Sequence, residues 1–210
     1  MADLGKLVIG STWLLMSLAW SVSHAQTVVA ADDVEFQLQV SRDSEGFSVC
    51  GIRAILVVLP PGKQTVSGAE SIDFSLMMSR GQWHALSKFG AHEYVTGKTS
   101  ENSKLITRAP APIKFSIVPA LDSKPFIPKK YIPADDHGFT LGIGDIGTAA
   151  TALSEMAHGT QMHAVVRYAN EKIDRTISFQ SQLKSNERDV LFKCFDEFHS
   201  VLKSQAELKR

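Results

Sequence analysis

Hydrophobic and polar residues alternate along much of the chain, which is the pattern of β-strands with one buried face. In Asp33–Ser41 the apolar side chains point to one side, and a glutamate and two glutamines point to the other. Phe47–Leu59 is a longer apolar segment in which every second residue, from Cys50 to Val58, shares one face. The turn-rich residues between these segments, Arg42–Gly46, predict that the two strands form a hairpin.

The same alternation predicts further strands downstream. They are Ile72–Met78, Trp83–Val95, Ile113–Val118, Phe139–Leu141, Met162–Tyr168 and a return strand from Ile173 to Phe179. We expect Trp83–Val95 to pair with the strand before it, and the last two strands to form a second hairpin. Because most of these strands have one polar and one apolar face, antiparallel pairing is favoured.

Two segments carry the 3.6-residue apolar spacing of helices. The short one is Thr148–His158, and the long one is Glu187–Lys209, for which we expect Asn186 to be the N-cap. The apolar stripe of the long helix consists of Val190, Leu191, Cys194, Phe195, Phe198, Val201 and Leu202. The sequence therefore predicts an α+β fold, with roughly six to nine mostly antiparallel strands in a sheet or sandwich, one short helix and a long C-terminal amphipathic helix packed on the sheet.

The segment Pro119–His137 is rich in proline and contains a basic cluster, Lys124, Lys129 and Lys130. Proline disfavours both helices and central strands, so we expect an exposed, extended loop here. Loops of this length often carry a function, and docking of a partner is one role open to it.

The first twenty-five residues have the three parts of a secretory signal peptide. A charged start is followed by the apolar run Leu7–Val22 and by small residues at Ser23 and Ala25. We therefore divide the chain into a signal peptide, residues 1–25, and a single β-rich exported domain, residues 26–210. The alternative is an uncleaved membrane anchor, but the apolar run is shorter than the roughly twenty residues that span a bilayer. After cleavage no stable membrane span is expected.

Acidic and basic residues balance, at 22 each over the whole chain. Because nucleic acids and anionic membranes attract a basic excess, this balance gives no support for binding to either. The low cysteine content and the absence of Asn-x-Ser/Thr sites favour a bacterial envelope over eukaryotic secretion. The expected location is therefore periplasmic or secreted.

Two cysteines, Cys50 and Cys194, fall within the predicted exported domain. Cys50 belongs to the buried face of its strand, and Cys194 belongs to the apolar stripe of the long helix. Since exported proteins fold in oxidising compartments, we predict a disulfide between them. Two buried free thiols are the alternative.

Gly142, Gly144 and Gly147 match the G-x-G-x-x-G pattern of dinucleotide-binding folds, between a short strand and a helix. Two features disfavour a cofactor site at these glycines. Asp145 would place a negative charge beside the pyrophosphate, and only one β-α-β unit is possible. The preferred interpretation is a glycine-rich turn in which Asp145 or Thr148 caps the helix, and no cofactor is predicted.

Glu155, His158 and His163 are spaced so that one helix turn and the following loop could bring three metal ligands to one side. Because the histidines are scattered through the chain, one such grouping is expected by chance, and we do not predict a metal site. The sequence contains no HExxH, G-x-S-x-G or P-loop motif, so no catalytic residue is predicted.

The β-rich body and the stretch Gly159–Phe179, where a glycine precedes two strands, resemble in general plan the small exported proteins of the invasion-associated locus B type. The terminal helix with Cys194 departs from that plan, as does the absence of a second cysteine pair. The resemblance therefore assigns no role to any residue.

Together these features favour a non-catalytic exported bacterial protein that acts through protein–protein contacts. An accessory of a secretion, conjugation or host-interaction apparatus is one such protein, and the expected partner is an envelope or extracellular protein. The alternative is an exported ligand-binding protein or enzyme. It would use the Gly142–Gly147 turn or the group formed by Glu155, His158 and His163.

Overall fold

The computed structural model describes residues 27–44, 46–59, 69–80, 84–95, 104–107, 111–120, 123–180 and 182–208. Within these ranges the chain forms eleven strands and two helices, which make an α+β fold. The predicted signal peptide, residues 1–25, lies outside the described residues. Neither helix in these ranges combines the length and apolar character needed to cross a membrane.

Seven strands of the described chain form the larger sheet, in the order β2-β3-β4-β5-β9-β8, with β6 paired to β5. They are β2 (Asp33–Asp43), β3 (Gly46–Val58), β4 (Glu70–Ser79), β5 (His84–Val95), β6 (Lys104–Thr107), β8 (Lys130–Pro133) and β9 (Phe139–Gly144). Every pairing in this sheet is antiparallel. The predicted hairpin of β2 and β3 and the predicted pairing of β4 with β5 are confirmed.

The smaller sheet has the order β1-β11-β10-β7. Its strands are β1 (Thr27–Ala30), β7 (Pro112–Pro119), β10 (Met162–Tyr168) and β11 (Arg175–Phe179). β10 and β11 form the predicted second hairpin, and β1 adds to the edge of β11 in the parallel direction. The described strands exceed the predicted number because alternation does not reveal β1, β6 and β8, which have only four residues each.

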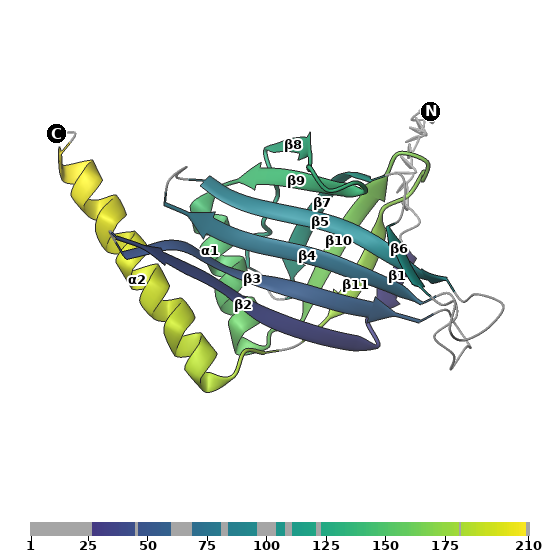
Figure 1. The fold of residues 1–210 in the computed structure, drawn as a ribbon, viewed down its shortest axis with the longest axis horizontal. Helices are drawn as coiled ribbons and strands as arrows, with labels where there is room; N and C mark the ends of the chain where they lie inside the picture. Colours follow the sequence, from purple (N-terminus) through teal and green to yellow (C-terminus); the bar gives the residue numbers. More distant parts are fainter. Residues whose placement is uncertain are drawn as a thin grey trace, which may run out of the picture.

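The smaller sheet and the helix α1 (Ile146–His158) lie on one side of the larger sheet (Figure 1). The second helix, α2 (Ser185–Leu208), crosses the end of the β2–β3 hairpin and contacts β3. Aromatic rings from both sheets meet in the core between them, where the centroids of Phe74 and Phe179 are 5.7 Å apart. The opposite side of the larger sheet carries the polar residues of the same strands.

The two helices begin differently. Asp145, one of the two predicted capping residues, is the N-cap of α1, and its carboxylate accepts the Thr148 N–H at 3.0 Å. The prediction that Asn186 caps the long helix is wrong, because α2 begins at Ser185, two residues before the predicted start, and Asn186 lies in its first turn. The Glu187 carboxylate instead accepts the Lys184 N–H at 3.0 Å, which satisfies a backbone donor ahead of the first turn.

The prediction of an exposed loop over Pro119–His137 is wrong in the middle of that segment. Phe126 is fully buried, and its backbone pairs with Ile117. β8 follows, and the Tyr131 hydroxyl donates to the Phe115 carbonyl at 2.6 Å. Prolines are compatible with this strand because β8 lies at an edge of the sheet, where a missing N–H breaks no ladder bond.

Candidate binding groove

A groove follows β4 along the polar side of the larger sheet. It encloses about 630 Å³, which lies within the range of roughly 300–1,000 Å³ that is typical of ligand pockets. β4 forms its floor, between β2 and β3 on one side and β5 with the β8–β9 loop on the other. The residues that line it are Gln39, Arg53, Asp73, Ser75, Met77, Lys88, His92, Asp136, His137 and Phe139. We call this site the polar groove.

Strand register aligns three residues of the polar groove in a row across the sheet. Arg53 on β3 and Lys88 on β5 are both paired with Ser75 on β4. Because neighbouring strands are about 4.8 Å apart, the backbones of the two cationic residues are about 10 Å apart, with a buried serine between them. Asp73 and Met77 point to the same side as Ser75, since side chains on a strand alternate.

Asp73 holds the Arg53 guanidinium in place from the neighbouring strand. Arg53 Nε donates to Asp73 Oδ1 at 2.9 Å, and Nη2 donates to Oδ2. This hydrogen-bonded pairing raises the pKa of Arg53, against the opposing effect of burial. Arg53 Nη1 has no hydrogen-bond partner among the described residues. Arg53 is therefore a fixed cation whose Nη1 group can donate to a ligand.

Lys88 forms the second cationic position of the polar groove. Its ammonium contacts Asp136 at the rim and lies 4.7 Å from the centroid of the Phe139 ring. The Lys88 hydrogen bond lowers the pKa of Asp136, so this carboxylate stays ionised to lower pH. Because the Asp136 side chain is 64% exposed, water screens the pair, and Lys88 can exchange Asp136 for another acceptor at low cost.

The Phe139 ring forms part of a wall of the polar groove. It lies against Gly90 of β5, where a Cβ atom would overlap the ring. His92 packs against the same ring, with the two centroids 5.5 Å apart. Gly90 is therefore required for close approach of the ring, and not for a turn.

Gln39 supplies a buried acceptor to the polar groove. Its Oε1 atom is shielded from solvent and accepts no hydrogen bond within the described part of the chain. Buried side-chain oxygens without a donor are uncommon in folded proteins because desolvation is not compensated. A bound group that carries an N–H would supply the missing donor.

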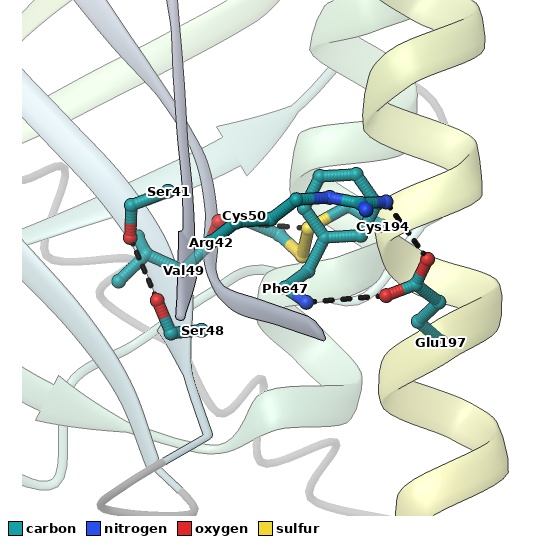
Figure 2. The surroundings of a disulfide bond; sticks show 8 residues. All are labelled: Ser41, Arg42, Phe47, Ser48, Val49, Cys50, Cys194 and Glu197. Atoms are coloured by element: carbon teal, nitrogen blue, oxygen red, sulfur yellow. Dashed lines mark hydrogen bonds and ion pairs between the residues drawn. A yellow bond between two sulfur atoms is a disulfide. The ribbon is translucent and has the colours of Figure 1, made fainter. Parts of the chain in front are cut away.

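The predicted disulfide between Cys50 and Cys194 is present, with the two Cα atoms 5.9 Å apart. Figure 2 shows that Glu197, one turn further along α2, contacts the end of the β2–β3 hairpin. Its carboxylate accepts the Phe47 N–H at 3.1 Å and a hydrogen bond from Arg42 Nη2 at 3.1 Å. A covalent and a charged contact thus join α2 to the hairpin at neighbouring points.

The predicted glycine-rich turn is wrong, because Gly142 and Gly144 lie inside β9. β9 is antiparallel to both β5 and β8, whereas a dinucleotide fingerprint follows a parallel strand. Packing accounts for both glycines: a Cβ at Gly142 would lie 2.6 Å from Pro128, and one at Gly144 would lie 2.5 Å from the Phe126 ring. Gly147 lies in the first turn of α1.

Glu155, His158 and His163 each have a separate polar partner. These partners are Ser123 and Thr160 for Glu155, Ser154 for His158, and Ser178 for His163. Within the described residues no group of three or more His, Cys, Asp and Glu side chains is placed to hold a metal ion. The structure therefore does not bring the three spaced residues together as a ligand set.

Sequence reasoning does not find the polar groove, because its residues occupy the polar positions of alternating strands. Such positions resemble ordinary solvent-facing residues. A usable signal was nevertheless present. Arg53 is the only charged residue in Phe47–Leu59, and Asp73 is the only one in Ile72–Met78. Opposite charges that stand alone in two successive apolar strands indicate a cross-strand pair on the outer face.

Comparison of the chain with protein-family models, with curated proteins and with solved structures finds no match. The class of protein is therefore described by the fold and the groove alone. In its described residues the chain is a β-rich α+β protein with two sheets, a disulfide that ties its C-terminal helix to the larger sheet, and a polar groove on the outer side of that sheet.

Proposed function

We propose that this is a non-catalytic exported bacterial protein, periplasmic or secreted, that binds an envelope or extracellular protein through the polar groove. Such a protein could serve as an accessory of a secretion, conjugation or host-interaction apparatus. The observation that carries the proposal is the groove itself, which combines two paired cations with a buried Gln39 oxygen that has no donor among the described residues.

The signal-like start of the chain and the disulfide both support an oxidising compartment. Cys50 and Cys194 are both fully buried, so the bond has the environment of a structural disulfide and not of an exposed, exchanging one. A structural disulfide persists where thiol reductants do not maintain free cysteines.

The charges of the polar groove support a protein partner over a nucleic acid. Arg53 and Lys88 each lie beside a carboxylate, so the positive and negative charges cancel within each pair. A nucleic-acid site would need an excess of cations along its length. Balanced, partly satisfied polar groups next to an aromatic ring are typical of the mixed surfaces by which proteins recognise one another.

The proposal is tested by capture of a partner from an envelope extract of the source cells, with three purified forms of the protein as bait. The first is the native sequence, and the second is Arg53→Gln/Lys88→Gln. The third is Lys193→Gln/Lys203→Gln, which removes the same charge from exposed positions on α2. We expect the first and third baits to retain a common protein that the second loses. Equal capture by all three, or no capture by the native form, would contradict the proposal.

A further inference from the structure

We propose that the occupant of the polar groove is an extended segment of a partner protein that places a carboxylate side chain between Arg53 and Lys88. This inference rests on the proposed function and adds the chemistry of the ligand.

The length of the polar groove suits an extended segment. β4 contributes Asp73, Ser75 and Met77, so the floor covers five residues of a strand. At about 3.3 Å per residue, this is a floor of about 16 Å. A segment of about five extended residues matches that length, and its side chains would alternate toward and away from the sheet.

The two cations are placed to receive one acid from opposite sides. Both are paired in register with Ser75, and within the described chain each keeps unused donors. The guanidinium of Arg53 uses two of its nitrogens on Asp73, and the Lys88 ammonium uses one hydrogen bond on Asp136. A carboxylate above Ser75 would accept from both cations without breaking the half-buried Arg53–Asp73 pair.

When that carboxylate is absent, Asp136 forms an ion pair with Lys88. The Lys88–Asp136 pair lies at the solvent-exposed rim, whereas the Asp73 side chain is only 17% exposed. An incoming carboxylate therefore competes with Asp136 for Lys88, and leaves Asp73 in place. Binding of the ligand carboxylate to Lys88 thus displaces Asp136 from the Lys88 ammonium.

The backbone of the segment supplies what Gln39 lacks. A peptide carries an N–H on each residue other than proline, and Gln39 Oε1 is a buried acceptor without a donor in the described chain. A ligand with both a carboxylate and amide donors satisfies the two sides of the polar groove together. A simple inorganic anion satisfies only the Arg53 and Lys88 side.

The probes are three capped pentapeptides, acetyl-Ala-Ala-X-Ala-Ala-amide with X as Glu, Gln or Lys, titrated into nitrogen-15-labelled protein with its disulfide formed. Amide shifts report both affinity and position. We expect the Glu peptide to bind most tightly, with shifts centred on β3, β4 and β5. Lys88→Gln should lower the affinity for the Glu peptide by about threefold, which is the typical contribution of a partly exposed ion pair. The affinity for the Gln peptide should not change. Asp136→Asn should tighten the Glu peptide by a similar factor.

Lys193→Gln on α2 is the matched control, since it removes one exposed cation away from the polar groove. Equal affinities for the Glu and Gln peptides, no binding of either, or shifts outside the groove would overturn the carboxylate proposal. Loss of partner capture by Arg53→Gln/Lys88→Gln together with equal peptide affinities would overturn the ligand assignment alone. Failure of capture would overturn the proposed function instead.

Discussion

Gly144 lies where β9 passes close to the buried ring of Phe126. A Cβ added there would lie 2.5 and 2.7 Å from two atoms of that ring. The ring is fully buried, so it cannot shift away toward solvent. Gly142 and Gly144, two of the three glycines that match a cofactor fingerprint in the sequence, are thus packing residues of a strand. The sequence matches the fingerprint at every position, yet the physical reason for these two glycines is close packing, against Pro128 and Ser87 at Gly142 and against the Phe126 ring at Gly144.

Gly144→Ala should lower the free energy of unfolding by about 1–3 kcal/mol, because overpacking a filled site forces its neighbours out of position. Urea unfolding of the purified protein measures the effect. Gly147→Ala is the matched control, since its Cβ would lie 3.2 Å from a single carboxylate oxygen of Asp145 in the first turn of α1. A loss for Gly144→Ala no greater than that for Gly147→Ala would contradict the packing explanation.

Tyr131 joins the two sheets through its hydrogen bond to the Phe115 carbonyl. Tyr131→Phe should lower the free energy of unfolding by about 1–2 kcal/mol near neutral pH, because the carbonyl loses its donor. Burial raises the pKa of Tyr131, so the folded protein keeps the phenol proton where the unfolded chain has lost it.

That difference stabilises the protein fully below about pH 10, and the stabilisation is lost as pH rises through the raised folded-state pKa. Native protein should therefore lose stability more steeply above about pH 10 than Tyr131→Phe does. Unfolding midpoints measured across the alkaline range test this, and parallel curves for the two forms would contradict it.

At the scale of elements, α2 depends on contacts far away in the sequence. The disulfide joins residues 144 positions apart, and the neighbouring Glu197 contacts lie at the end of the same β2–β3 hairpin. Few other elements touch α2 so closely, since its contacts are chiefly with β3 and β2. The disulfide therefore stabilises both the domain and the placement of the helix.

Cys50→Ala/Cys194→Ala should lower the free energy of unfolding by about 2–5 kcal/mol in oxidising buffer. Amide hydrogen exchange should quicken most in α2, because the helix loses its covalent attachment. The control is native protein whose disulfide has been reduced in the unfolded state. Its free energy of unfolding should match that of the variant. An unchanged unfolding midpoint would contradict a stabilising role for the bond.

Elements with many alternating residues were predictable from the sequence, and short or irregular ones were not. β3 and β4 place an apolar residue at every second position, so their buried faces can be predicted from the sequence alone. β8 is only four residues long and follows several prolines, so local propensity points to a loop. Its strand character comes from pairing with β9, which the four residues of β8 do not reveal by themselves.

At the scale of the whole molecule, the polar groove arises from register. Arg53, Ser75 and Lys88 lie far apart in the sequence, and each alone resembles a solvent-facing residue. Two antiparallel pairings, β3 with β4 and β4 with β5, align them, and the β8–β9 loop then brings Asp136 to the rim. The sequence predicted the strands and their outward faces, whereas the site depends on which outward residues become neighbours.

We infer that the outward face of the larger sheet, and not the covered one, meets a partner. A photo-reactive amino acid placed at Met77, on the floor of the polar groove, and separately at the exposed Lys193 of α2, tests this in the source cells. We predict a discrete protein adduct from position 77 upon illumination and none from position 193. No adduct from position 77, or the same adducts from both positions, would contradict the account.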